Sequence, residues 1–195
     1  MSHYYNKEVS VDSDEKTLEF RYHDKIIKLI SDHGVFSRER VDYGTRVLLD
    51  TVHLDDCHSL LDMGCGYGVI GLSIKMVYPD IEIDMVDINE RAIALSKKGC
   101  AQNGLNVNIY QSDLYEKVNK HFDAILSNPP IRAGKQVVFA IIEDAYHHLN
   151  EEGSLWIVIQ KKQGAPSTKK KMNEVFGNCE IVKRDKGYYI LRSKR

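Results

Sequence analysis

The chain has 195 residues, which suits one domain of ordinary size, and its 43% hydrophobic and 28% charged residues exclude long disorder. Its four cysteines include no CxxC pair, which excludes a disulfide scaffold and a zinc site evident from the sequence. The first residues are too polar for a signal peptide, and no apolar run approaches the ~18 residues of a membrane span. We therefore expect a cytoplasmic protein with no membrane partner and no metal.

The formal net charge of -1 is unevenly distributed along the chain. Residues 160–195 hold eleven of the 27 basic residues but three of the 28 acidic ones. A basic end on an acidic body indicates a polyanionic partner, although a solvated charged surface would have the same composition. Charge alone leaves both interpretations open.

Residues 1–58 are predicted to form an N-terminal extension packed on the domain that follows. Apolar residues alternate over positions 18–22, and positions 26–30 form an apolar run, which together predict a β-hairpin. Helical spacing of apolar residues over positions 41–49 predicts a helix. The second part, residues 59–195, is predicted to be the catalytic domain.

Strands and helices alternate from residue 59 onward. Apolar runs predict strands at residues 59–63, 81–88, 107–110, 122–126, 155–159, 180–182 and 188–191. Helical patterns occupy residues 69–77, 89–102, 136–149 and 168–176. This order predicts an α/β fold with a parallel sheet covered on both faces. The link over residues 183–187 is too short for a helix, so the last two strands should be antiparallel.

The first strand of this domain ends in a glycine-rich loop. Ligands of open α/β sheets bind at the carboxyl ends of the strands, and glycines there let the backbone approach a ligand closely. Residues 66–71 match the GxGxxG pattern of NAD-dependent oxidoreductases, with Asp87 at the fitting distance. However, Asp62 directly before the loop would repel a pyrophosphate and attract a cationic ammonium group. S-adenosylmethionine (SAM) carries such a group and no phosphate.

The ends of the next two strands carry further polar groups. Asp113 could accept a hydrogen bond from an adenine amine, with the Leu114 N–H at a ring nitrogen, although a lone Asp also caps helices. Asn128, Pro129 and Pro130 combine a side-chain amide with a stiffened backbone that lacks two N–H donors. An amide oxygen and a rigid carbonyl can accept both hydrogens of a planar NH2 group. Catalysis would then rest mainly on orientation.

Together these motifs resemble the class I SAM-dependent methyltransferases. More narrowly, five segments look like the small methyltransferase-domain group, which includes the RsmC-like guanine-N2 methyltransferases of small-subunit ribosomal RNA: residues 34–37, 41–45, 62–71, 128–135 and 160–165. The similarity covers about residues 33–195. It implies a Rossmann-like fold with a seven-stranded, mostly parallel sheet, an antiparallel last strand and helices on both faces.

The resemblance also implies roles for individual residues. SAM would be held by Thr45, Asp62, Gly64, Cys65, Gly66, Gly68, Asp87, Ile88, Asp113, Leu114 and Asn128, with Asp62 at the ammonium group, Asp87 at the ribose and Asp113 at the adenine. The catalytic loop that receives the target amine would comprise Asn128, Pro129, Pro130 and Ile131. RNA phosphates would be met by Arg132, Lys135, Lys161 and Lys162.

The sequence therefore predicts a SAM-dependent N-methyltransferase that acts on an exocyclic amine. Guanine N2 of small-subunit ribosomal RNA is the expected acceptor, and RNA is the expected partner. A protein glutamine N-methyltransferase or an adenine-N6 RNA or DNA methyltransferase stays open, because each substrate also presents a planar NH2 group. An NAD-dependent oxidoreductase is the distant alternative.

Overall fold

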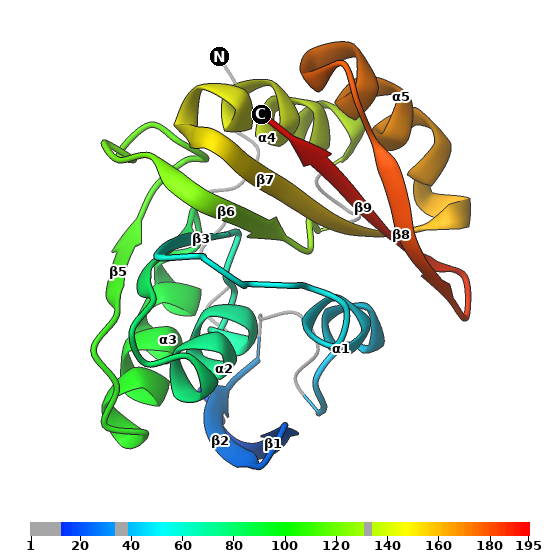
Figure 1. The fold of residues 1–195 in the computed structure, drawn as a ribbon. Helices are drawn as coiled ribbons and strands as arrows, with labels where there is room; N and C mark the ends of the chain where they lie inside the picture. The colour runs from blue at the N-terminus through cyan, green and yellow to red at the C-terminus, as the bar shows by residue number, and fades with distance from the viewer. Residues whose placement is uncertain (1–12, 34–38, 131–133) are drawn as a thin grey trace.

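A computed structural model describes residues 13–33, 39–130 and 134–195. A seven-stranded sheet lies at its centre, and a separate two-stranded hairpin lies beside the helices on one face (Figure 1). The strand order in the larger sheet is β5-β4-β3-β6-β7-β9-β8. Its strands are β3 (Ser59–Met63), β4 (Glu82–Asp87), β5 (Asn108–Gln111), β6 (Phe122–Ser127), β7 (Leu149–Gln160), β8 (Glu180–Asp185) and β9 (Tyr188–Lys194).

The strand directions confirm the predicted sheet. The pairs β3–β4, β3–β6, β4–β5 and β6–β7 are parallel. Strand β9 is inserted between β7 and β8 and is antiparallel to both, as the short link before it requires. The carboxyl ends of β3, β4, β5 and β6 therefore meet along one edge of the sheet.

Helices cover both faces of the sheet, as predicted (Figure 1). The helices α1 (Tyr43–Leu49), α2 (Val69–Val77) and α3 (Glu90–Gln102) lie on one face, and α4 (Gly134–His148) and α5 (Ala165–Phe176) on the other. Each face has its own apolar cluster. Successive β3 residues divide between the two clusters, with Leu60 in one and Leu61 in the other, because side chains alternate along a strand.

Several element boundaries differ from the sequence prediction. Strands β8 and β9 continue beyond their predicted ends, to Asp185 and Lys194. Strand β7 begins at Leu149 and so includes Gly153, which lies ahead of the strand predicted at residues 155–159. A Cβ there would lie 2.8 Å from the Asn150 carbonyl oxygen, and the β6–β7 register shifts nearby, so this glycine marks an irregularity inside a strand. Helix α5 begins at Ala165 after a short 3-10 turn, η2 (Lys161–Gln163), and has its proline in the first turn, where proline is tolerated.

The hairpin, β1 (Lys16–Tyr22) and β2 (Lys25–Ser31), confirms the predicted strand pair and packs on α2 and α3. Phe20 and Ile27 are buried in the same apolar cluster as β3 and these helices. The described part of the extension thus shares its core with the sheet domain.

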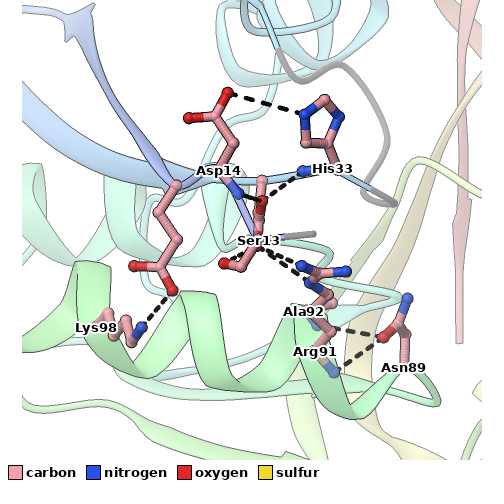
Figure 2. A network of polar contacts seen from close by, with 9 residues as sticks. Ser13, Asp14, His33, Asn89, Arg91, Ala92 and Lys98 are labelled. Atoms are coloured by element: carbon pink, nitrogen blue, oxygen red, sulfur yellow. Dashed lines mark hydrogen bonds and ion pairs between the residues drawn. The ribbon is translucent and has the colours of Figure 1, made fainter. Parts of the chain in front are cut away.

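A polar network joins the N-terminal segment to α3 (Figure 2). The buried Asp32 carboxylate accepts hydrogen bonds from the Arg91 guanidinium, the Ser13 hydroxyl, and the N–H groups of Asp14 and His33. Burial alone would raise the pKa of Asp32, but these donors outweigh it and hold the pKa below its usual range. The network fixes the first turn of α3, which lies beside the candidate site described below.

Candidate functional site

A cavity of about 1260 Å³ opens along the edge where the parallel strands end. Pockets for one small molecule typically enclose about 300–1,000 Å³, so this cavity has room for a cofactor and part of a second substrate. Its position agrees with the general rule for ligands of open α/β sheets. Segments that follow β3, β4, β5, β6 and β7 contribute to its wall, together with α1 and β9.

The glycine-rich loop after β3 forms one wall of the cavity. Gly64, Gly66 and Gly68 have φ values of 73°, 55° and 95°, a conformation that other L-residues rarely adopt. A Cβ on Gly64 or Gly66 would meet no atom within 4 Å, so the backbone conformation selects glycine at these two positions. Cys65 also lines the cavity, but burial raises the pKa of its thiol, which argues against a nucleophilic thiolate.

Asp62 lies beneath this loop, outside the cavity lining. Its side chain is fully buried, and its Oδ2 accepts a hydrogen bond from the Gly71 N–H at 2.9 Å. Its Oδ1 has no hydrogen-bond partner among the described residues. Burial raises the pKa of Asp62 to about 7, the Gly71 N–H opposes this shift, and the Asp87 carboxylate adds to it. The contact between Asp62 and an ammonium group therefore stays a prediction. The carboxylate that would make it is buried beneath the loop.

The residues predicted for the ribose and adenine lie together along the same cavity. Asp87 accepts hydrogen bonds from the Gly66 N–H at 2.9 Å and from the Asn89 N–H at 2.8 Å. Burial raises the pKa of Asp87, although these N–H groups partly oppose the shift. The other residues predicted for this part of the cavity also line it: Ile88, which is 46% exposed, Asp113 and Leu114.

The Asn128 side chain is held by hydrogen bonds to two residues at the start of α1. Its Nδ2 donates hydrogen bonds to Thr45 Oγ1 at 2.8 Å and to Asp42 Oδ2 at 3.1 Å. The opposite amide orientation would place the Asn128 carbonyl oxygen against the Asp42 carboxylate. These contacts therefore assign Nδ2 to the side of Asp42 and Thr45 and Oδ1 to the other side. No described residue donates to the Asn128 Oδ1, and Asn128 and Pro129 both line the cavity. This arrangement leaves an oriented amide oxygen for a ligand.

Sequence reasoning missed three residues at this end of the cavity. Asp42 is the N-cap of α1, and its spacing to Thr45 is a readable capping signal, but nothing local indicates its bond to Asn128. Gln160 and Tyr188 also line the cavity and are joined by a hydrogen bond of 2.7 Å from Gln160 Nε2 to the Tyr188 hydroxyl. Gln160 begins the 160–165 segment that carries the family resemblance, but nothing in the sequence indicates its bond to Tyr188.

The residues predicted to meet RNA are only partly assembled at the cavity. Lys135 lines it, as does Pro130 of the predicted catalytic loop, and the Lys135 Nζ lies 4.9 Å from the centroid of the Phe139 ring. Lys161 and Lys162 are exposed on η2 and lie outside the lining. Two predicted site residues lie outside the described ranges: Ile131 and Arg132.

The described residues contain neither a candidate metal cluster nor a candidate membrane-spanning helix. Within residues 13–33, 39–130 and 134–195, no cluster of three or more His, Cys, Asp or Glu side chains could bind a metal ion. In the same ranges, every helix is too short or too polar to cross a bilayer.

Comparisons with known proteins assign the chain to a family. Residues 26–192 match the methyltransferase small domain family. A Bacillus subtilis (strain 168) relative, uncharacterized protein YbxB, is 49% identical over 99% of this chain and 98% of its own length. The ribosomal RNA small subunit methyltransferase C of Klebsiella pneumoniae is 31% identical over 96% of this chain but 54% of its own length. The chain thus spans about half the length of that relative.

A solved structure has the same fold. The T. thermophilus 16S rRNA N2 methyltransferase RsmC, in complex with AdoMet and guanosine, superposes with a TM-score of 0.84 at 22% identity, over 93% of this chain and 50% of the other. The match to residues 26–192 excludes the alternative of an oxidoreductase. The chain belongs to the methyltransferase small domain family, and it is a SAM-dependent methyltransferase with a Rossmann-like fold.

Proposed function

We propose that this protein methylates an exocyclic amine of ribosomal RNA, with guanine N2 of the small-subunit RNA as the acceptor. The observation that carries the proposal is the oriented amide of Asn128, whose Nδ2 is occupied by Asp42 and Thr45. The names of the relatives support ribosomal RNA as the substrate class. The guanosine bound to the T. thermophilus enzyme supports a guanine acceptor.

The cofactor end of the cavity fits SAM by its donor and acceptor set. Beneath the loop, the buried Asp62 Oδ1 has no hydrogen-bond partner among the described residues and would attract a cationic ammonium group bound above it. The Asp87 carboxylate keeps acceptor capacity for ribose hydroxyls beyond its two N–H contacts, and Ile88 offers an apolar surface to an adenine ring. When bound, SAM supplies an electrophilic methyl group on its sulfonium.

The acceptor end holds the amine in place. Asn128 Oδ1 and the Pro129 carbonyl would accept the two hydrogens of the acceptor NH2 group and so orient its nitrogen for the methyl transfer that bound SAM would supply. Because Asp42 and Thr45 fix the amide before substrate arrives, little reorganisation accompanies the reaction. The methylated nitrogen is acidic and loses its proton to water, so these residues need supply no strong base.

Basic side chains near the opening complete the proposed site. Lys135 at the cavity wall and the exposed Lys161 and Lys162 would meet phosphates of the RNA backbone. Arg132 keeps the same proposed role from its place in the sequence.

Transfer of labelled methyl from SAM tests the proposed function. Total RNA, small ribosomal subunits and a protein extract are incubated side by side, and the labelled material is digested and identified. We expect the label in N2-methylguanosine of small-subunit RNA. Label in protein glutamine or in N6-methyladenosine would overturn the acceptor while leaving the enzyme class intact.

A further inference from the structure

The acceptor end of the cavity contains an aromatic ring that the proposed mechanism does not use. Two aromatic side chains line the cavity within the described residues, Tyr67 and Tyr188. Tyr67 is only 4% exposed, whereas Tyr188 at the start of β9 is half-buried. Tyr188 therefore offers a ring face to a bound molecule. The loop that carries Asn128 contributes prolines and Ile131 but no aromatic residue.

The Tyr188 ring is held in a fixed position beside the residues that orient Asn128. A Cβ on Gly44 would lie 2.6 Å from Tyr188 Cε1, so the ring packs directly on the α1 backbone between Asp42 and Thr45. The Tyr188 hydroxyl accepts a hydrogen bond from Gln160 Nε2 at 2.7 Å. Both contacts reduce the conformational freedom that Tyr188 would lose when a ligand binds.

Further aromatic and basic groups continue from Tyr188 onto the surface. The Tyr43 ring lies 5.8 Å from the Tyr188 ring, centroid to centroid, and the Lys186 Nζ lies 4.8 Å from the Tyr43 centroid. The Lys161 N–H donates to the Gly187 carbonyl at 2.8 Å, which brings η2 against the β8–β9 turn. We call Tyr43, Lys161, Lys186 and Tyr188 the aromatic–basic corner.

Within the described residues, no carboxylate pairs with the two lysines of this corner. Lys161 and Lys186 are exposed, and neither forms an ion pair with any carboxylate in the described part of the chain. Other basic residues of the C-terminal region do have acidic partners: Lys170 with Glu174, Lys171 with Glu143, and Arg192 with Glu180. Lys161 and Lys186 thus place unpaired positive charge beside the half-buried rings of Tyr43 and Tyr188.

We propose that the aromatic–basic corner binds a single-stranded RNA segment, with the acceptor base stacked on Tyr188 and the flanking phosphates at Lys161 and Lys186. Aromatic faces interleaved with cations are the typical means by which proteins bind unpaired nucleotides, and an enzyme that modifies a base must take it out of its stack. This proposal rests on the proposed function and names the surface that would select RNA. A glutamine side chain has neither a ring to stack nor a polyanionic backbone.

RNA binding by the full chain tests the corner. The probe is a fluorescein-labelled single-stranded RNA of mixed sequence, about 12 nucleotides long, a length within the range that one such site covers. Its affinity is measured by fluorescence anisotropy at several salt concentrations. Tyr188→Leu should weaken binding roughly five- to a hundredfold, the range expected for the loss of one base–aromatic stack. Lys186→Ala should weaken binding and reduce the salt slope by about one.

Matched variants separate this role from a structural one. Tyr188→Phe keeps the ring but not the hydroxyl bonded to Gln160, so it should bind RNA nearly as tightly as the wild type. Lys170→Ala removes an equal charge from the exposed surface of α5 and should leave the affinity unchanged. Calorimetry with S-adenosylhomocysteine should give the same affinity for Tyr188→Leu and wild type, which shows that the cofactor end is intact.

The outcomes distinguish the corner from the proposed function. Suppose that the wild type methylates guanine N2, and that Tyr188→Leu and Lys186→Ala both keep their RNA affinity within twofold of it. The proposed role of the corner in RNA binding is then wrong, and the proposed function stands. If wild type binds the RNA in a Tyr188-dependent way but labels another acceptor, the corner stands and the proposed function fails. Absence of wild-type binding to the single-stranded probe would overturn the corner directly.

Discussion

The two ends of the cavity are built in different ways. The glycine loop of the cofactor end is backbone from a single stretch of chain: the left-handed turns at Gly64 and Gly66, tied to the Asp87 carboxylate 21 residues later. The acceptor end consists of side chains from distant elements. Asn128 on the β6 side bonds to Asp42, 86 residues earlier, and Gln160 bonds to Tyr188, 28 residues later.

This difference implies different sensitivities to substitution. The glycine loop and Asp87 belong to one β–α–β unit, so the conformation of this part of the cofactor end depends on glycines and on one neighbouring strand. The acceptor end exists only after α1 and β9 have packed against the sheet. Substitutions there should impair methyl transfer while leaving cofactor binding intact, and the three predictions below test this separation.

The largest effect is expected for Asn128→Ala. Loss of the oriented amide oxygen should lower kcat by ~10² or more, since catalysis here rests on positioning the amine. Affinity for S-adenosylhomocysteine, measured by calorimetry, should stay near the wild-type value. Asp87→Ala is the matched opposite, because it removes a cofactor contact and should chiefly weaken that affinity. Equal losses of turnover and cofactor affinity in Asn128→Ala would contradict the proposed division of the cavity.

The sequence predicts the cofactor end better than the acceptor end for a physical reason. A positive φ selects glycine locally, so the loop can be recognised from consecutive residues, and β3 and α2 lie at the predicted positions. The burial of Asp62 could not be predicted in the same way, because it depends on β3 lying between β4 and β6. Likewise, a capping pattern reveals the bond of Asp42 to the Thr45 N–H but not its bond to Asn128.

Asp42→Ala should have an intermediate effect. It removes one of two acceptors that orient the Asn128 amide and also the N-cap of α1, a loss that typically costs about 1 kcal/mol of stability. We expect kcat to fall roughly tenfold with little change in cofactor affinity, since one anchor of the amide, Thr45, remains. The measurement is a steady-state rate series with SAM saturating.

A second variant separates orientation of the amide from simple loss of the cap. Asp42→Asn restores a capping side chain, and its carbonyl oxygen can accept from Asn128 Nδ2. It should recover most of the stability and part of the rate. A variant that recovers melting temperature but none of the rate would point to a need for the Asp42 charge itself. If Asp42→Ala retained the full rate, Asp42 would have no positioning role.

The smallest effect, and the one that tests the cofactor end most finely, is expected for Asp62→Asn. The pKa of Asp62 is about 7 in the folded protein and about 3.9 in an unfolded chain, so the folded state binds the proton more tightly. Its contribution to stability is therefore fully present below about pH 4 and is lost as pH rises through 7. An asparagine side chain at this position would keep an acceptor for the Gly71 N–H and has no charge to bury, so the variant should gain stability relative to wild type as pH increases.

Thermal unfolding between pH 5 and 8.5 measures this gain, with and without the cofactor. Without SAM, the gain in melting temperature should level off above about pH 7. For a chain of this length, each kcal/mol of added stability raises the melting temperature by roughly 2–4 °C. Glu151→Gln, which neutralises an exposed carboxylate, should show no such trend. At pH 8, saturating SAM should raise the melting temperature of the wild type more than that of Asp62→Asn. An ammonium group near Asp62 would favour the charged form of its carboxylate, which the variant lacks. Equal gains would mean that Asp62 supports the glycine loop from below and does not attract the cofactor, which would leave the cofactor end held by backbone and Asp87.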